Sequence, residues 1–214
     1  MSGNYKEIYV QSIKDKENFW KKISDDIFWY SKPTKILNTD NPPFYKWFQD
    51  GITNTCYNAL DFHIDNALGD KTALIWDSPI TNSKATYTFS QLREKVALFA
   101  GALKNQGALK GDRIIINMPM IPEAVIAMLA CARIGAIHSV VFGGFASNEL
   151  ANRIDDSKAK IIISASCGYE PGRTVEYKPL LNKAIEIAKH KPERCVVFQR
   201  KDFKANLDSK LDVD

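Results

Sequence analysis

The chain has 214 residues, of which 45% are hydrophobic and 25% are charged, a composition typical of a globular protein. Its 29 basic and 25 acidic residues give a formal charge of +4, a small and dispersed excess that does not favour a nucleic-acid partner. The first residues lack the apolar run of a signal peptide, and no apolar stretch reaches the ~18 residues needed to cross a bilayer. Nucleic-acid and membrane partners are therefore not expected.

The cysteines and histidines give no sign of a metal site. The four cysteines show no CxxC spacing, and three of them lie in apolar segments: Cys56, Cys131, Cys167 and Cys195. Reduced, buried thiols are therefore favoured over disulfides or metal ligands, which indicates a cytosolic or organelle-matrix compartment. The three histidines are far apart in the sequence, so a metal cluster built from them has no support from spacing.

Residues 5–50 are rich in aromatic side chains and are interrupted by prolines. Asp15 is placed to cap a helix whose apolar residues recur at helical spacing. We expect this segment to form a helical wrap whose tryptophans are buried against residues after Asn54, although a helix and loop that serve stability alone would fit the same pattern. The three tryptophans of the segment are Trp20, Trp29 and Trp47.

The next residues predict a helix over 55–66 and a pair of strands. His63 lies on or beside the apolar face of that helix, and we interpret it as a core histidine rather than a ligand. The strands, 72–77 and 85–87, are joined by a short turn region and should pair antiparallel. Thr88 and Gln91 then form a capping-box pattern ahead of a helix that ends at Gly107.

The stretch 111–163 organises the rest of the chain, because short β-branched runs alternate there with helical segments. The runs are nearly continuous in apolar residues, as in strands that are buried on both faces: 113–117, 136–141 and 160–163. The intervening helices are predicted over 122–134 and 148–157. Pro122 can take the first helical position, Gly135 can end that helix in the left-handed conformation, and Ser147 can cap the second helix.

This alternation predicts consecutive right-handed βαβ units and therefore an α/β fold with a mainly parallel, helix-flanked sheet. Ligands of such sheets gather beyond the carboxyl ends of the strands. Any chemistry should therefore be sought at three segments: Asn117-Met118-Pro119, Phe142-Gly143-Gly144 and Ser164-Ala165-Ser166.

The segment after Ser166 is polar and turn-rich, and we expect it to be a loop. A helix over 180–189 and a last strand over 194–198 should follow, and from Gln199 the chain is expected to fray. Within the loop, Pro171-Gly172 fixes a turn between Glu170 and Arg173. The planar guanidinium of Arg173 suits a phosphate, although a lone loop arginine is more often only solvated.

Two glycines after the second strand of the sheet, Gly143 and Gly144, allow close approach of the backbone either to a ligand or to a neighbouring helix. The well-known phosphate, zinc and hydrolase motifs are missing from the sequence: GxxxxGK[ST], GxGxxG, HExxH and GxSxG. The sequence therefore contains no motif that supports a kinase-like, dinucleotide-binding, zinc-protease or hydrolase-elbow interpretation.

Longer stretches of the sequence resemble one family closely. MPMIPEAVIAMLACARIGAIHSVVFGGFAS, RIDDSKAKIIISAS and EPGRTVEYKPL are similar to short-chain acyl-CoA synthetases, the acetyl- and propionyl-CoA synthetase branch of the adenylate-forming, AMP-binding superfamily. NPPFYKWFQDGITNTCYNALDFHI is similar to the N-terminal region of that branch. The sequence around Glu170 and Arg173 most resembles that of the mitochondrial, propionate-preferring short-chain enzymes of animals.

The resemblance implies an AMP-forming ligase that joins propionate or acetate to coenzyme A, using ATP and Mg²⁺, through an acyl-AMP intermediate. It also implies that the loop of Glu170, Pro171, Gly172 and Arg173 contacts the 3′-phosphorylated adenosine end of coenzyme A. Acetyl-CoA synthetases often have an arginine in place of Glu170, so one phosphate contact is expected to be missing here. Gly143 and Gly144 are expected to line the same pocket.

The resemblance also implies that the chain corresponds to the first third of such an enzyme. An acetyl-CoA-synthetase-type N-terminal region is expected over 1–60 and a truncated AMP-binding domain over 61–214. The ATP and Mg²⁺ sites and the catalytic lysine would lie beyond Asp214, so we expect no catalytic and no metal-binding residue in this chain, and no activity from it alone. The compartment would be the mitochondrial matrix or the cytoplasm.

Two alternatives stay open at this point. A non-catalytic interaction or regulatory module could be built on the same α/β half-domain. An unrelated doubly wound nucleotide-binding protein would need a glycine-rich phosphate loop, which is missing from the sequence.

Overall fold

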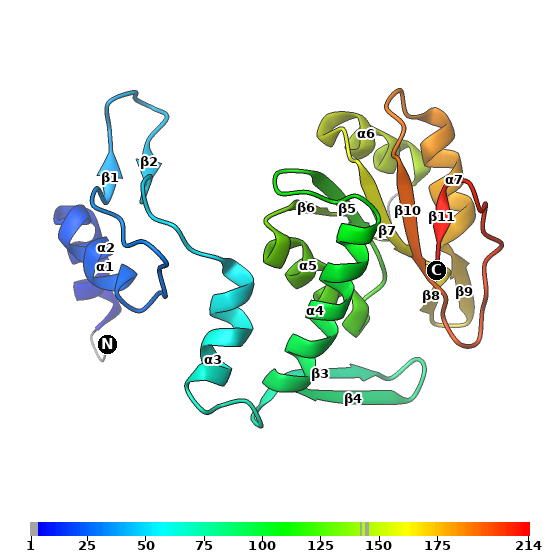
Figure 1. Ribbon diagram of the computed structural model, residues 1–214, viewed down its shortest axis with the longest axis horizontal. Coiled ribbons are helices and arrows are strands. Elements are labelled where there is room, and N and C mark those ends of the chain that lie inside the picture. Colours follow the sequence, from blue (N-terminus) through cyan, green and yellow to red (C-terminus); the bar gives the residue numbers. More distant parts are fainter. Residues whose placement is uncertain (1–3, 142, 144–145) are drawn as a thin grey trace. The chain divides into compact units, whose positions relative to one another are not determined.

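The computed structural model describes residues 4–141, 143 and 146–214 (Figure 1). The chain divides into two compact units, Met1–Asn58 and Ala59–Asp214. Within the described residues, no helix is both long enough and apolar enough to cross a membrane.

The first unit contains two short helices, α1 (Tyr5–Lys14) and α2 (Lys16–Ser24), and a small antiparallel pair, β1 (Leu37–Asn38) with β2 (Lys46–Trp47). The helix that was predicted from Asp15 is α2, but the Asp15 carboxylate accepts hydrogen bonds from the Asn18 side chain instead of capping the backbone. Helix α1 was not predicted, because its apolar residues form no buried face.

The tryptophans of the first unit pack on aromatic neighbours within that unit. Trp20 meets Trp47 edge to face, with ring centroids 6.1 Å apart, and Trp29 lies 5.6 Å from Phe48. The Trp29 indole also donates a hydrogen bond of 2.8 Å to the Ser24 carbonyl. Aromatic pairs of this geometry are favourable beyond the area that they bury. Burial of these rings against the second unit stays a prediction.

The helix expected after Asn54 is present, with a π-helical turn, η1 (Tyr57–Asp61), ahead of α3 (Phe62–Asp65). The half-buried His63 ring stacks on Phe89 at 4.7 Å, which agrees with a packing role. Strands β3 (Thr72–Ser78) and β4 (Ser83–Thr88) form the expected antiparallel hairpin, and α4 (Phe89–Asn105) follows it. Both hydrogen bonds of the predicted capping box are made between Thr88 and Gln91.

The predicted parallel sheet is confirmed and forms the centre of the second unit. Its order is β11-β10-β7-β5-β6, and every neighbouring pair is parallel. The strands are β5 (Arg113–Asn117), β6 (Ile137–Val140), β7 (Ile161–Ala165), β10 (Arg194–Phe198) and β11 (Asp212–Val213). The crossover helices are α5 (Pro122–Ile134), α6 (Ser147–Ser157) and α7 (Tyr177–Ile187).

Helices cover both faces of the sheet, as Figure 1 shows. One face packs on α6 and α7 in a closed apolar core to which alternate strand residues contribute, among them Ile115, Ile162 and Val197. The intervening residues, such as Ile163 and Val196, point to the side of α4 and α5, where an apolar groove of about 440 Å³ remains. Each Val or Ile that is fully buried contributes about 1.5–3 kcal/mol relative to an exposed one.

Three local expectations were wrong. The stretch after Ser166 is no loop but a tight antiparallel hairpin, β8 (Cys167–Glu170) with β9 (Arg173–Glu176), because a two-residue turn lets its polar strands pair. The C-terminal residues do not fray, since β11 adds to the sheet beside β10. Ser147 is the first residue of α6 rather than its cap, and its hydroxyl donates instead to the Leu180 carbonyl.

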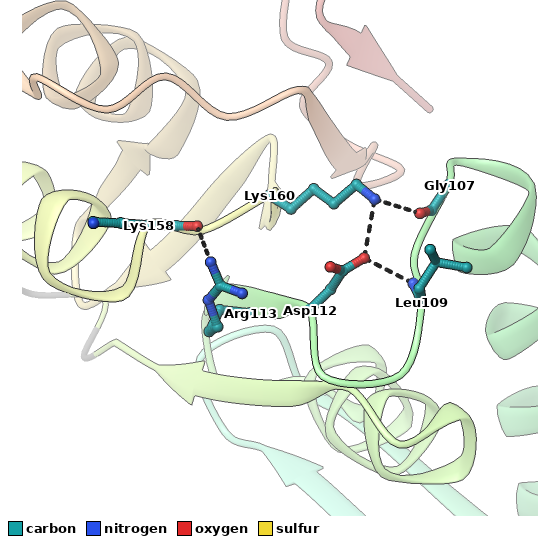
Figure 2. Close-up of polar contacts among 6 residues, drawn as sticks. All are labelled: Gly107, Leu109, Asp112, Arg113, Lys158 and Lys160. Atoms are coloured by element: carbon teal, nitrogen blue, oxygen red, sulfur yellow. Dashed lines mark hydrogen bonds and ion pairs between the residues drawn. The ribbon is translucent and has the colours of Figure 1, made fainter.

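A polar network ties together the amino ends of β5 and β7 (Figure 2). The Lys160 ammonium lies 3.0 Å from the Asp112 carboxylate and 2.8 Å from the Gly107 carbonyl. The same carboxylate oxygen accepts a 2.8 Å hydrogen bond from the Leu109 N–H. Beside them, Arg113 donates from its guanidinium to the Lys158 carbonyl. Asp112, Arg113 and Lys160 therefore all have partners within the fold.

Candidate functional site

A cleft of about 600 Å³ lies at the carboxyl edge of the sheet. The segments that follow the four longer strands of the sheet contribute to it: residues 118–121 after β5, Val140, Val141 and Gly143 around the end of β6, residues 168–170 after β7, and Arg200 after β10. The opposite wall is the turn of the β3–β4 hairpin, residues 76–81. The cleft is therefore where the parallel-sheet rule predicts a ligand.

The strand order explains why the sheet opens at this point. From β5 the chain crosses to β6 on one side and then returns to β7 on the other side of β5. The connecting helices α5 and α6 consequently lie on opposite faces, and the loops beyond β5 and β7 diverge. A crevice at such a reversal of strand order is the usual ligand site of open α/β sheets.

The four residues predicted to bind a cofactor meet at the tip of the β8–β9 hairpin. Gly172 has a φ of +76°, which a residue with a side chain rarely adopts, and Pro171 precedes it in the turn. The register pairs Glu170 directly with Arg173. The Arg173 guanidinium places Nη2 at 2.6 Å and Nε at 2.8 Å from the same Glu170 oxygen. The Arg173 guanidinium, which the sequence analysis predicts to bind a phosphate, is thus occupied by a carboxylate of its own hairpin.

Glu170 lines the cleft, whereas Arg173 lies on its rim. Arg173, Gly172 and Glu170 line a shallow neighbouring pocket on the outside of the hairpin. Both side chains of the Glu170–Arg173 pair are exposed, at 47% and 71%. An exposed pair of this kind contributes only ~0–1 kcal/mol, so a phosphate can compete with Glu170 for the guanidinium.

Two glycines make room for the buried Tyr177 ring at the floor of the cleft. A side chain on Gly143 would collide with the Tyr177 hydroxyl, and one on Gly168 would come within 2.8 Å of its ring. Of the two interpretations of Gly143, close packing against a neighbouring helix is therefore confirmed, since Tyr177 begins α7. Gly143 also lines the cleft. Gly144 and Phe142 lie outside the described residues.

Burial raises the pKa of the Tyr177 phenol, and the nearby Glu170 carboxylate raises it further. Tyr177 is therefore a neutral hydroxyl at physiological pH. It can hydrogen-bond to a ligand but cannot serve as an anionic base.

Tyr169 and Arg200 form a second feature of the cleft. The Arg200 guanidinium lies over the Tyr169 ring, 4.3 Å from its centroid, in a cation–π contact. The backbone of Arg200 is fixed as well, because its N–H donates a 2.9 Å hydrogen bond to the buried Ser166 hydroxyl, which itself donates to the Phe203 carbonyl. The pKa of Tyr169 is raised, first by burial and then by the adjacent Cys167.

The structure thus brings together part of the expected site. Met118, Pro119 and Gly143 line the cleft, whereas Asn117, Ser164 and Ser166 are buried behind it. The sequence analysis missed three aromatic residues and one arginine as members of the site: Trp76, Tyr169, Tyr177 and Arg200. Trp76 closes the opposite wall by donating a 2.9 Å hydrogen bond to the Met120 carbonyl. Arg200 carried one usable signal, since it follows the last long strand by two residues.

No group of three or more histidine, cysteine or acidic side chains that could hold a metal ion occurs in the described part of the chain. The four cysteines are buried and free of disulfides. Burial raises the pKa of Cys131 and of Cys195 to about 12, so both thiols are neutral and unreactive at physiological pH.

Two family models match the chain. Residues 63–213 match the AMP-binding enzyme family, and residues 5–59 match the acetyl-coenzyme A synthetase N-terminus. Among solved structures, an acetoacetyl-CoA synthetase from Streptomyces lividans shares the fold with a TM-score of 0.85. It is 22% identical, and the match covers 99% of this chain and 32% of that one.

Closer relatives are found among characterised sequences. Acyl-CoA synthetase short-chain family member 3, mitochondrial, of Rattus norvegicus is 51% identical over 213 residues, which are 99% of this chain and 31% of the relative. Propionate–CoA ligase of Escherichia coli is 44% identical over 211 residues, 99% of this chain and 33% of the relative. The chain therefore spans about a third of the length of the relatives it matches. From these matches and its fold, the chain belongs to the AMP-binding enzyme family, in the branch that carries an acetyl-coenzyme A synthetase N-terminus.

Proposed function

We propose that this chain forms the coenzyme A-binding part of a short-chain acyl-CoA synthetase that acts on propionate or acetate. The observation that carries the proposal is the 51% identity, over nearly the whole chain, to an acyl-CoA synthetase of the short-chain family. The match to a propionate–CoA ligase over 99% of the chain points to the same class of acid.

The proposed reaction has two steps. A carboxylate oxygen attacks the α-phosphorus of ATP, so that pyrophosphate leaves and an acyl-AMP forms. The sulfur of coenzyme A then attacks the acyl carbonyl carbon, and AMP leaves with the electrons of the broken C–O bond while the thiol proton passes to solvent or a base. Mg²⁺ would compensate the charge of the triphosphate in the first step.

In this proposal the described residues act in the second step, by holding coenzyme A. Glu170, Pro171, Gly172 and Arg173 would contact the 3′-phosphorylated adenosine end, with Arg173 exchanging its Glu170 partner for phosphate oxygens. The groups that hold ATP, Mg²⁺ and the acid would come from the remaining two-thirds of the length of the relatives. A mitochondrial location would follow if the chain shares the compartment of its mitochondrial relatives.

Titration calorimetry of coenzyme A into the 214-residue chain tests the proposal. We expect saturable binding, and we expect Arg173→Ala to weaken it by about 10- to 150-fold, the loss of one charge-assisted phosphate contact. Arg93→Ala, at a half-buried position of α4 that does not line the cleft, is the matched control for loss of one positive charge. Binding that is equally weak in both variants would contradict a role for the hairpin tip.

A second assay tests whether this chain alone can carry out the ATP-dependent first step. ATP–pyrophosphate exchange with propionate or acetate should not exceed the no-protein background when the chain is assayed alone, because no group that positions the triphosphate of ATP is assigned to it. Exchange clearly above background would place an ATP site within these 214 residues and would contradict the proposed assignment.

A further inference from the structure

We propose that Arg200, held over the Tyr169 ring, is the residue that supplies the positive charge of the cleft to a phosphate group of the bound nucleotide. The inference rests on the proposed function and adds to it a contact outside the hairpin tip. It starts from the charged side chains of the cleft and from what each is bound to.

Three of the described residues that line the cleft are charged: Asp77, Glu170 and Arg200. The Asp77 carboxylate is 2.8 Å from the Lys84 ammonium, and the Glu170 carboxylate is held by Arg173 at 2.6 Å. Both acidic groups are therefore neutralised by cations. Within the part of the chain that the structure describes, the Arg200 guanidinium forms neither an ion pair nor a hydrogen bond, so its charge is the one left over.

Arg200 is half-buried, which makes an unpaired charge more costly there than on an open surface. The Tyr169 ring offsets part of this cost, since the guanidinium lies 4.3 Å from the ring centroid. A ring is not a hydrogen-bond acceptor of the usual kind, so among the described residues the guanidinium N–H groups are left without an acceptor. Asp202, which lines an adjoining pocket with Arg200, forms no ion pair with it among the described residues.

The position of Arg200 is also fixed before any ligand binds. Its backbone N–H is bound to the Ser166 hydroxyl at 2.9 Å, and its side chain is stacked on Tyr169 from β8. A planar donor that is held in place loses less conformational entropy on binding an oxyanion than a flexible one does. Arg173 differs in this respect, since it must first release Glu170. Arg200 therefore fits a diphosphate or phosphomonoester of an adenine nucleotide.

The test is titration calorimetry with coenzyme A and with 3′-dephospho-coenzyme A, at one fixed ionic strength. Arg200→Ala is expected to weaken binding of coenzyme A by about 10- to 150-fold. Arg194→Ala removes the same charge from the opposite end of the same strand, β10, and should leave the affinity within about twofold. Arg200→Lys keeps the charge but loses the planar fork, and should fall between wild type and Arg200→Ala.

The second ligand separates the two possible phosphate sources. If Arg200 contacts the 3′-phosphate, Arg200→Ala abolishes the preference of the protein for coenzyme A over the dephospho form. If it contacts the internal diphosphate, the variant weakens both ligands by the same factor. Arg200→Met retains the apolar stem over Tyr169 and replaces Arg200→Ala if the alanine variant fails to fold, as judged by circular dichroism.

Two results would overturn the inference, and they differ in whether the proposed function is rejected with it. If wild type binds coenzyme A and the Arg200 variants bind it equally well while Arg173→Ala does not, the proposed function stands and the role of Arg200 is rejected. If wild type shows no binding at millimolar coenzyme A, both the proposed function of this cleft and the role of Arg200 are rejected.

Discussion

The two edges of the parallel sheet use their charged side chains in opposite ways. At the amino edge, Asp112 and Lys160 bind each other and the neighbouring backbone, and Arg113 donates to the Lys158 carbonyl (Figure 2). At the carboxyl edge the charges lie around a cleft, and Arg200 is stacked on an aromatic ring without an acidic partner among the described residues. The comparison indicates that charges with partners stabilise the fold, whereas the charge without one is available to a ligand.

If partnered charges stabilise the fold, the most deeply buried pair should show the largest effect. Lys178 and Asp212 are 4% and 0% exposed, and their charged groups lie 2.8 Å apart. Lys178→Met leaves the Asp212 carboxylate buried without its cation, and we expect a loss of about 3–5 kcal/mol in the free energy of unfolding, measured by urea denaturation.

The matched control is Lys183→Met, which removes an exposed lysine from the same helix, α7. Its pair with Glu186 is largely solvated, so we expect a change of no more than ~1 kcal/mol. A loss for Lys178→Met that is as small as the loss for Lys183→Met would show that the buried pair does not hold β11 against α7.

The amino edge should give the next largest effect. Asp112→Ala removes the acceptor of the Leu109 N–H and the carboxylate partner of Lys160, whose side chain is only 21% exposed. Leaving such groups unpaired costs about 1–3 kcal/mol in unfolding free energy. The affinity for coenzyme A should not change, because the cleft lies at the other edge. If Asp112→Ala changed the affinity for coenzyme A and left the stability unchanged, the amino edge would serve ligand binding rather than stability, which would contradict the comparison.

The same carboxylate makes the amino edge sensitive to acid. Burial acts to raise the pKa of Asp112, but the Leu109 N–H and the Lys160 ammonium outweigh it, and the pKa is lowered. A lowered folded-state pKa means that the stabilisation is complete above the unfolded value of about 3.9 and is lost as the pH falls through the folded value.

The stability difference between wild type and Asp112→Asn should therefore be constant near neutral pH and shrink below about pH 4. Urea denaturation at a series of pH values measures it. A difference that grows toward low pH would mean that the carboxylate is not stabilised in its charged form.

The smallest effect concerns the rim of the cleft. Glu170→Gln removes the charge that holds Arg173, a contact between two exposed side chains. Since such pairs contribute ~0–1 kcal/mol, the affinity for coenzyme A should rise by no more than about fivefold, and the gain should fade as salt is added. A loss of affinity would instead show that the Glu170 carboxylate favours coenzyme A binding through its own contact more than it opposes binding by holding Arg173.

Local signals in the sequence were sufficient for most elements of the second unit, but not for the β8–β9 hairpin or for β11. Continuous apolar runs identified the buried strands, Pro122 and Gly135 marked the ends of α5, and Thr88 with Gln91 marked the start of α4. These signals work because helix ends and buried strands depend on neighbouring residues. The hairpin β8–β9 was missed because its strands are polar, and polar strands have no periodicity that distinguishes them from a loop.

The location of the site was likewise set by the sequence, since alternating strands and helices imply a parallel sheet and a ligand at its carboxyl edge. The sequence also identified the turn Pro171-Gly172 and the arginine that follows it. It did not predict that Glu170 would bind that arginine, because this contact depends on the register of two strands whose existence was not expected.

Tertiary structure alone decided which residues share the cleft. Trp76, Tyr169, Tyr177 and Arg200 come from four separate segments, and nothing in their local sequence sets the distances between them. Those distances follow from the order of the strands, from the crossing of α5 and α6 to opposite faces, and from two glycines that leave room for one tyrosine ring. The sequence therefore determined the sheet and the edge at which the cleft lies, while long-range packing determined which charged side chains of the cleft are paired and which are not.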